Sequence, residues 1–227
     1  MRLYTGKGDD GTTGLLYGGR VRKDAPIVEA NGAVDEAQAA VGAARAEVER
    51  GSEVDRLLTG VERDLWVLMA ELATAPENRH KLVGATSLVS RGMVSAVEAS
   101  VDDLGERFEL PAEFVLPGQD RLSALLDVAR TVVRRAERLA VNVAAPGSEA
   151  VAYLNRLSTL LWVMARWQEH GHALASRSVG SAVAGERGTA VPEGQPGPGG
   201  QPVPEGQPAG EGQPVGADTA AGGGAQR

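Results

Sequence analysis

The sequence predicts an all-α protein, an up-and-down bundle of five helices with a glycine-rich N-terminal loop and a disordered C-terminal tail. Three observations support this fold class. Apolar residues recur at three- and four-residue steps in five successive segments, which is the period of helices that bury one face. Short connections, several with proline or glycine, separate the segments. No segment convincingly shows the two-residue alternation of a strand. Five such helices favour a bundle.

Residues 4–23 are rich in glycine and polar side chains, with too few apolar positions for a helix or a buried strand. We expect a loop. Glycine permits positive φ and close approach of the backbone, so successive N–H groups can surround an anion. The side chains that could add hydroxyl or ammonium donors are Thr5, Thr12, Thr13, Lys7 and Lys23. A mobile chain end would have a similar composition, so both interpretations stay open.

The first helix is predicted from Pro26, at the favoured first-turn position, to about Arg50. Its apolar residues form a seven-residue repeat, typical of a bundle seam rather than of a lone surface helix. The repeat comprises Ile27, Val34, Val41 and Val48, with Ala30, Ala37 and Ala44. Asp35 flanks this seam, where its carboxylate could pair with an arginine of another helix.

The second, third and fifth helices follow from the same period. They are predicted over residues 54–75, 86–104 and 148–176, with Pro76 ending the second. Trp66, Trp162 and Trp167 are interpreted as core or interface anchors rather than as part of a cofactor site.

The fourth helix is predicted to start near Asp120, after an extended apolar entry at 114–118, and it carries a stripe of arginines. Arg130, Arg134 and Arg138 are four residues apart, so they lie on one side and repel one another. One interpretation is a solvated face relieved by neighbouring carboxylates. The other is a polyanion site, because guanidinium groups match phosphate oxygens bidentately. The spacing alone does not decide between them.

Composition limits the function classes. The chain has 227 residues, a formal net charge of −7 and no cysteine. The acidic balance argues against a general nucleic-acid or membrane-surface binder. The lack of cysteine excludes a disulfide, a thiolate metal site and a cysteine nucleophile. The sequence shows neither a signal-peptide pattern nor an apolar run of transmembrane length, so we expect a cytoplasmic protein.

The C-terminal segment differs from the rest. From Gly180 onward it holds 14 of the 30 glycines and 7 of the 12 prolines, with no aromatic residue, and VPEGQP occurs twice. Such a segment cannot bury enough apolar surface to offset its ordering entropy. We therefore predict a folded domain at 1–178, with residues 1–25 as its ligand-binding loop, and a disordered tail at 179–227. The tail is either a neutral extension or a tether for a partner.

Five ordered stretches, at compatible spacing over nearly all of residues 3–168, resemble the PduO-type ATP:corrinoid adenosyltransferases. YTGKGDDGTT at 4–13 and GGRVRKDAPIVEANGAVDE at 18–36 are similar to that family's YTKTGDxGTT and GxRVxKxxxxxEAxGxVDE. Residues 65–74 are similar to LxxGxxLAT. The strongest matches are FVLPG…VARTVVRRAER at 114–138 and YLNRLSTLLWVMAR at 153–166.

The resemblance implies a fold and an activity. The family forms five-helix bundles that usually assemble as trimers. Its members transfer the 5′-deoxyadenosyl group of ATP to the cobalt of cob(I)alamin, giving adenosylcobalamin and triphosphate, with Mg²⁺ bridging phosphate oxygens. No residue of this chain is assigned as a metal ligand. An adenosylcobalamin-dependent mutase is a possible recipient of the product.

The resemblance also implies site residues. In the family, the aspartate of VDE pairs with the arginine of ART, which here are Asp35 and Arg130, and the phenylalanine before xLPG lines the corrin site, which here is Phe114. Those three are the catalytic candidates. The remaining candidates belong to the nucleotide site, and they are Thr5, Gly6, Lys7, Gly8, Asp9, Gly11, Thr12, Thr13, Lys23, Arg134, Glu137, Arg138 and Asn155.

Three departures from the family pattern stand in these motifs. Gly6 and Lys7 occupy positions where lysine and threonine are usual, Asp127 replaces the histidine of HxAR, and Thr159 replaces the aspartate of LNRLSD. None removes a candidate for the phosphate or axial position, so activity is expected. Two other classes remain as alternatives: a module that binds ATP or adenosylcobalamin and delivers it to a mutase without turnover, and a purely structural helical oligomer.

Overall fold

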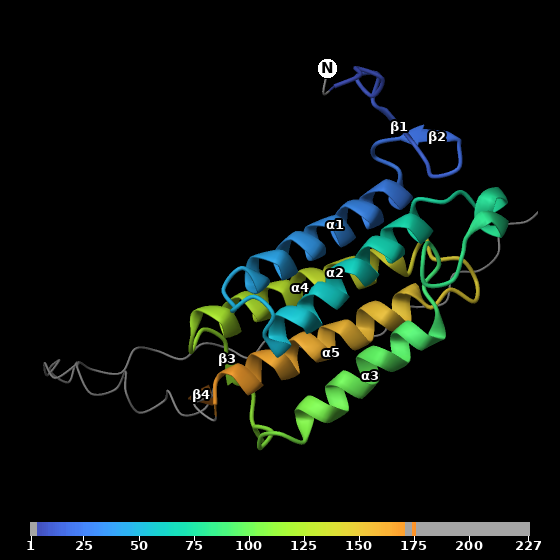
Figure 1. The fold of residues 1–227 in the computed structure, drawn as a ribbon. Helices are drawn as coiled ribbons and strands as arrows, with labels where there is room; N and C mark the ends of the chain where they lie inside the picture. Colours follow the sequence, from blue (N-terminus) through green and yellow to red (C-terminus); the bar gives the residue numbers. More distant parts are fainter. Residues whose placement is uncertain (1–3, 171–173, 176–227) are drawn as a thin grey trace, which may run out of the picture. The chain divides into compact units, whose positions relative to one another are not determined.

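The computed structural model describes residues 4–170 and 174–175, and it confirms an all-α bundle (Figure 1). The helices are α1 (Pro26–Arg45), α2 (Glu53–Leu72), α3 (Arg91–Gly105), α4 (Arg121–Ala140) and α5 (Ala150–Gln168), with a short 3₁₀-helix η1 (Pro76–Lys81) between α2 and α3. Helix α1 packs against both α2 and α4, α4 packs against α5, and α5 packs against α3. Helices α1 and α4 therefore lie at the centre of the packing order.

Ion pairs between the helices show which helices run parallel and which run antiparallel. Arg121 pairs with Glu47 and Arg135 pairs with Glu36, so α1 and α4 run antiparallel. Arg91 pairs with Glu149, and Arg156 with Glu98, so α3 and α5 run parallel. Consecutive helices alternate in direction along the chain, as Figure 1 shows, which is the predicted up-and-down topology.

The middle of the predicted seven-residue repeat is buried in α1, whereas Ile27 is only partly buried and Val48 lies beyond the helix. Val34, Val41, Ala30, Ala37 and Ala44 are fully inaccessible to solvent. Alanine at every second core position of this helix lets α2 and α4 approach closely. The buried face of α2 is larger, with Leu58, Leu65, Leu68 and Leu72, whereas the buried face of α4 is mostly small, with Ala129, Ala136 and Ala140.

Local capping explains where α4 begins. The Asp120 carboxylate accepts a hydrogen bond from the Ser123 amide at 2.8 Å, and the Ser123 hydroxyl accepts one from the Asp120 amide at 3.3 Å. This reciprocal capping box satisfies two of the amides that lack partners at a helix N-terminus. It fixes the register of the arginine stripe relative to the preceding FVLPG segment.

Several predicted boundaries were wrong by a few residues. Helix α1 ends at Arg45 rather than near Arg50, and α3 begins at Arg91, capped by Ser90, rather than at Thr86. Helix α5 ends at Gln168, and His170 has a positive φ of 49°, which cannot continue a right-handed helix. After α1, apolar periodicity continues because Val48 still packs against the core beyond the helix end.

The prediction of no strands was also wrong, although the strands are short. Strand β1 (Thr12–Gly14) pairs antiparallel with β2 (Arg20–Arg22), so the glycine-rich segment contains a hairpin. Strand β3 (Val115–Leu116) pairs with β4 (Leu174–Ala175). Strands of two or three residues are too short to show a period in sequence, and they are formed by backbone pairing rather than by an apolar pattern.

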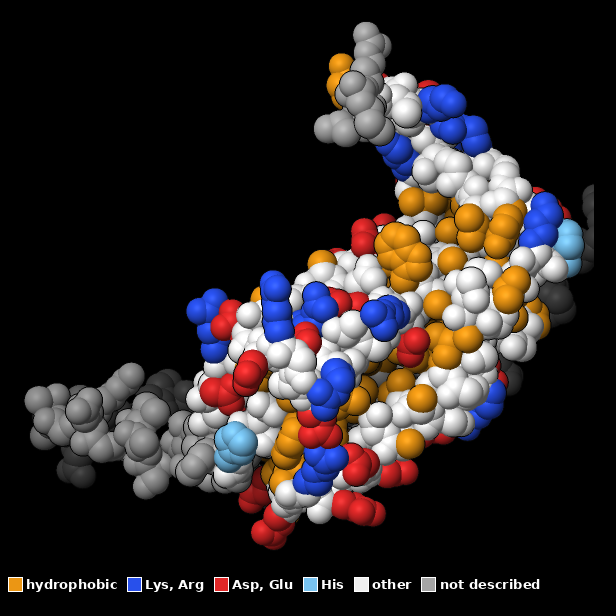
Figure 2. Space-filling model, in the orientation of Figure 1, with side chains coloured by type: hydrophobic (Ala, Val, Ile, Leu, Met, Phe, Trp, Pro, Cys, Tyr) orange, Lys and Arg blue, Asp and Glu red, His pale blue; other side chains and the backbone are white. Residues whose placement is uncertain are grey.

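On the face shown in Figure 2, hydrophobic side chains gather between charged side chains of both signs. Trp66 is 67% exposed, so of the two predicted roles, core or interface anchor, the chain by itself rules out only the core, whereas Trp162 and Trp167 pack partly buried against the core. No helix in the described part of the chain is both long and apolar enough to cross a bilayer. The predicted tail at 179–227 lies outside the described residues.

Candidate active site

The glycine-rich segment forms a compact turn structure ahead of α1. Gly6 and Gly11 have positive φ values of 70° and 78°, which glycine adopts without the steric penalty of a side chain. The Asp9 amide donates to the Gly6 carbonyl, and the Gly11 amide donates to the Gly8 carbonyl. Two successive tight turns thus place the glycines and exposed polar groups on one small surface.

Lys23 is brought to this turn by the hairpin. Its amide donates to the Gly11 carbonyl at 2.9 Å. A side-chain carbon on Gly8 would lie 3.1 Å from the Lys23 ammonium and 3.2 Å from the Thr12 carbonyl. Gly8 is therefore required by this close approach, and the structure brings Gly8, Gly11, Thr12 and Lys23 together as a single cationic turn.

Arg20 organises the same turn, and sequence reasoning had not selected it. Its guanidinium donates to the Lys7 carbonyl at 2.7 Å and to the Thr12 hydroxyl. That hydroxyl donates in turn to the Asp10 carboxylate at 2.7 Å. The hydrogen bonds from Thr12, together with Arg20, lower the pKa of Asp10 below its usual value. The Thr12 hydroxyl is thus occupied within the loop, while Thr5 and Lys7 are exposed.

The three arginines of the stripe on α4 differ in environment. Arg130 is partly buried, and its Nε donates to the Asp127 carboxylate at 2.9 Å. Arg134 and Arg138 are exposed, and neither forms an ion pair within the described residues. Arg138 donates only to the backbone carbonyl of Arg134. The polar surface of α4 therefore carries two arginines whose charge is not matched by a nearby carboxylate in the described chain.

Glu137 and Asn155 meet across the interface between α4 and α5. The Asn155 amide donates to the Glu137 carboxylate at 2.9 Å, and its carbonyl accepts from Arg156 at 2.7 Å. These bonds fix the Glu137 carboxylate one helical position from Arg138. Glu137 is thereby joined to Asn155, and Arg138 is joined to Arg134 through the Arg134 carbonyl.

The implied pair between Asp35 and Arg130 is not formed within the chain, so that expectation was wrong for a single subunit. Asp35 is exposed on α1 and forms no ion pair among the described residues, whereas Arg130 pairs with Asp127. The reason is the antiparallel register of α1 and α4. The ion pairs of Glu36 with Arg135 and of Glu47 with Arg121 place Asp35 level with residues 133–136 of α4, about 5–9 Å of helix away from Arg130.

A pocket of about 560 Å³ lies at the end of the bundle beside the FVLPG segment. Its wall is formed by Ala112, Glu113, Phe114, Val115, Pro117, Asp127, Arg130, Trp162 and Arg166. Phe114 is 89% exposed, an unusual state for a phenylalanine that packing would otherwise bury. The pocket thus combines aromatic and aliphatic surface with the guanidinium groups of two helices.

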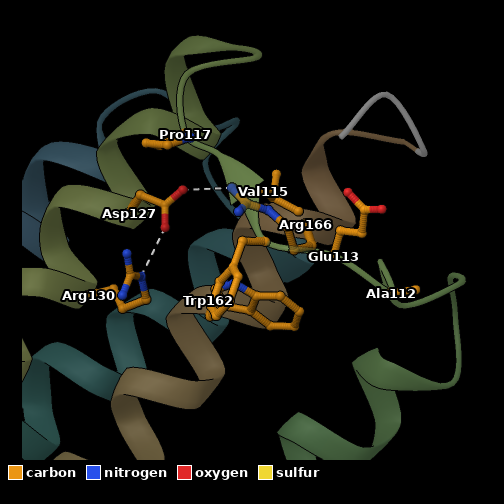
Figure 3. Close-up of a pocket in the computed structure, with 9 residues that line it drawn as sticks. Ala112, Glu113, Val115, Pro117, Asp127, Arg130, Trp162 and Arg166 are labelled. Atoms are coloured by element: carbon orange, nitrogen blue, oxygen red, sulfur yellow. Dashed lines mark hydrogen bonds and ion pairs between the residues drawn. The ribbon is translucent and has the colours of Figure 1, made fainter. Parts of the chain in front are cut away.

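Asp127 lies between two arginines on this wall, as Figure 3 shows. Its second carboxylate oxygen accepts from Arg166 at 2.6 Å, and Arg166 also donates to Glu169 at 2.8 Å. Side-chain exposure is 5% for Asp127 and 2% for Arg166. Burial raises the pKa of Glu169 above its usual value, against the opposing effect of Arg166. Four side chains of alternating charge therefore run from the pocket into the bundle.

The candidate residues lie on three separate surfaces of the chain: the N-terminal turn, the polar face of α4, and the pocket. No hydrogen bond or ion pair in the described residues links residues 4–23 to the arginine stripe. Sequence reasoning missed Arg20, Trp162 and Arg166 as site residues and noted Asp127 only as a departure. Arg20 lies in the motif at 18–36 and Arg166 in the motif at 153–166, and these positions could have marked both residues as site candidates.

These surfaces define a class: a helical bundle with cationic groups suited to a polyanion and a partly apolar pocket suited to a large ring system. The chain belongs to the cobalamin adenosyltransferase family, whose model matches residues 3–168. The family assignment that the motifs predicted is therefore confirmed.

Named relatives agree with this. The corrinoid adenosyltransferase of Mycobacterium tuberculosis is 39% identical over 170 residues, covering 73% of this chain and 87% of the relative. That of Citrobacter freundii is 37% identical over 171 residues, covering 74% and 95%.

Solved structures agree as well. A variant PduO-type ATP:corrinoid adenosyltransferase from Lactobacillus reuteri, complexed with cobalamin and ATP, matches with a TM-score of 0.67 at 25% identity. The match covers 76% of this chain and 97% of that one. Another variant of that enzyme, complexed with ATP, matches with a TM-score of 0.65 at 26% identity.

Proposed function

We propose that the protein transfers the 5′-deoxyadenosyl group of ATP to cob(I)alamin, giving adenosylcobalamin and triphosphate. The observation that carries the proposal is the family match over residues 3–168, together with relatives named for this activity. The three surfaces described above supply what the reaction needs: cations for a triphosphate, a polar contact for the nucleoside, and a pocket with an aromatic wall.

The triphosphate would bind to the N-terminal turn and to the exposed arginines of α4. In the turn, the Lys23 ammonium lies beside the backbone of Gly8, so a cation and an amide lie on one surface. On α4, Arg134 and Arg138 offer bidentate donors. Mg²⁺ would arrive with the triphosphate, keeping phosphate and water oxygens as its main ligands.

The two phosphate-binding surfaces would meet at a boundary between subunits. Within one chain, no described contact joins the turn to the stripe, and Arg134, Arg138 and Asp35 are all exposed. Trp66 and Val128, 67% and 53% exposed, are apolar surface that association would cover. We propose a homotrimer, as the resemblance implies; light scattering at micromolar concentration tests it, and a monomer that retains full turnover would contradict a shared site.

The corrinoid would occupy the pocket beside Phe114. An aromatic ring there can fill the lower axial position of cobalt without offering a lone pair. A four-coordinate cobalt(II) is then easier to reduce by an external one-electron reductant. Val115, Pro117 and Trp162 would add apolar contacts to the ring system and exclude water from it.

The chemistry needs no protein nucleophile. The electron pair of cobalt(I) attacks C5′ of the ribose, a cobalt–carbon bond forms, and the C5′–oxygen bond breaks with its electrons leaving on triphosphate. The protein orients C5′ toward cobalt and stabilises the charge that grows on the departing oxygen. Arg134, Arg138 and Lys23 are the groups proposed for that second task.

The direct test is to incubate the full chain with ATP, Mg²⁺ and chemically reduced cobalamin and to follow the absorbance change that accompanies adenosylcobalamin formation. Multiple turnovers per subunit are the expected result. Tight binding of ATP or adenosylcobalamin without turnover would identify a carrier instead. No ATP-dependent shift in thermal unfolding would leave only a structural bundle.

A further inference from the structure

Arg130 has two candidate carboxylate partners, and the structure distinguishes them. Asp127 lies one turn before it on the same helix and accepts from its Nε at 2.9 Å. Asp35, the partner that the resemblance implies, is exposed on α1 and offset from Arg130 by about 5–9 Å along the helix axis. Within the chain, Asp127 is therefore the group that determines where the Arg130 guanidinium lies.

Asp127 is suited to this task because it is itself held rigidly. Its other oxygen accepts from Arg166, which is almost completely buried and also bonded to Glu169. A carboxylate shared by two guanidinium groups has little freedom to rotate. Figure 3 shows Asp127 between Arg130 and Arg166, with both ion pairs drawn and Trp162 close by on the same wall.

Charge balance gives Asp127 a second effect on the pocket. Two arginines and two carboxylates leave the group of four neutral. Without the Asp127 charge, Glu169 would be the one remaining carboxylate of this group, and it contacts Arg166 but not Arg130. Because Arg130 is 28% exposed and Arg166 only 2%, Arg130 is the one that would leave its place. The pocket would lose a fixed donor and gain an unmatched cation.

We propose that Asp127 is the positioning residue for Arg130 in this chain, holding its guanidinium at the pocket wall. The inference rests on the proposed function, which places the corrinoid in this pocket. It concerns a residue at which the chain departs from its family, since histidine is usual there. An acidic side chain at this position makes the pair with Arg130 internal to α4, and Arg166 of α5 holds the second oxygen of that carboxylate.

The test compares Asp127→Asn with Asp35→Asn in the full chain, measuring KM separately for corrinoid and for ATP. Asparagine keeps the size of aspartate but replaces one acceptor oxygen by an NH2 donor, so only one of the two guanidinium groups keeps its present acceptor. We expect Asp127→Asn to raise the corrinoid KM about tenfold or more, the effect of losing one charge-assisted hydrogen bond, with a much smaller change in the ATP KM. Asp35→Asn should raise the corrinoid KM less. Asp102→Asn, at an exposed carboxylate on α3, is the matched control.

A second comparison remains informative if Asp127→Asn folds poorly. Asp127→His restores the residue usual in the family and removes the internal carboxylate. In that background Asp35 becomes the remaining candidate partner. Adding Asp35→Asn should therefore raise the corrinoid KM by a factor several times larger than the same change does in the unmodified chain. Equal effects of Asp35→Asn in both backgrounds, or a larger effect of Asp35→Asn than of Asp127→Asn on the corrinoid KM, would overturn the inference.

Phe114→Ala separates failure of this inference from failure of the site assignment. If Phe114→Ala raises the corrinoid KM but Asp127→Asn does not, Asp127 has no positioning role and the pocket assignment stands. If neither variant changes the corrinoid KM, the corrinoid does not bind in this pocket, and both proposals fall.

Discussion

Replacing Arg134 by alanine separates binding from folding more clearly than any other single change on α4. The side chain is exposed and forms no hydrogen bond or ion pair in the described residues, so its loss should change the free energy of unfolding by less than about 0.5 kcal/mol. Its proposed contact with triphosphate is a charge-assisted hydrogen bond, worth about 1.5–3 kcal/mol. If that contact acts in the transition state, kcat/KM for ATP should fall roughly 10- to 150-fold.

The assay is the formation of adenosylcobalamin from chemically reduced cobalamin at sub-saturating ATP, with urea unfolding of the same preparation. Arg121→Ala is the control, because it removes the same charge from an exposed site at the other end of α4, where the side chain pairs with Glu47. Activity of Arg134→Ala within about threefold of the unmodified protein would refute the assignment. A matching loss in Arg121→Ala would show that the effect is one of general charge.

Three further changes test other parts of the structure. Phe114→Ala should slow adenosylation more when the reaction starts from cob(II)alamin than from prereduced cob(I)alamin; equal slowing would remove its axial role. Burial raises the pKa of Asp64 above its ordinary 3.8, so the stability it contributes is full below that pH and is lost as pH rises through the folded-state pKa. Asp64→Asn, which cannot titrate but can still accept from the Tyr153 hydroxyl, should therefore gain stability relative to the unmodified protein as pH rises above 3.8, and an identical pH dependence of urea unfolding in the two proteins would contradict this. Leu161→Ala, at a fully buried position of α5, should lower the free energy of unfolding by about 2–5 kcal/mol, measured by urea, and a loss below about 1 kcal/mol would mean that the core collapses around the site.

The sequence by itself determined the helices and the family. The seven-residue repeat of α1 predicted burial of Val34 and Val41 because helical periodicity depends only on residues a few positions apart. It also predicted that Glu137 and Arg138 lie beside Arg134, since all three are on one helix. The motifs at 4–13 and 114–138 identified the family for the same reason. Each is a pattern of nearby residues that can be recognised without knowing which side chains it contacts.

Only the tertiary structure decided which charges meet. The pair of Arg130 with Asp127 rather than Asp35 depends on the register between α1 and α4, which the ion pair of Glu36 with Arg135 reveals. The burial of Arg166 depends on α5 packing at the pocket end of α4. Neither register nor packing depth is set by the spacing of residues within one helix, because both follow from how the side chains of two helices fit together.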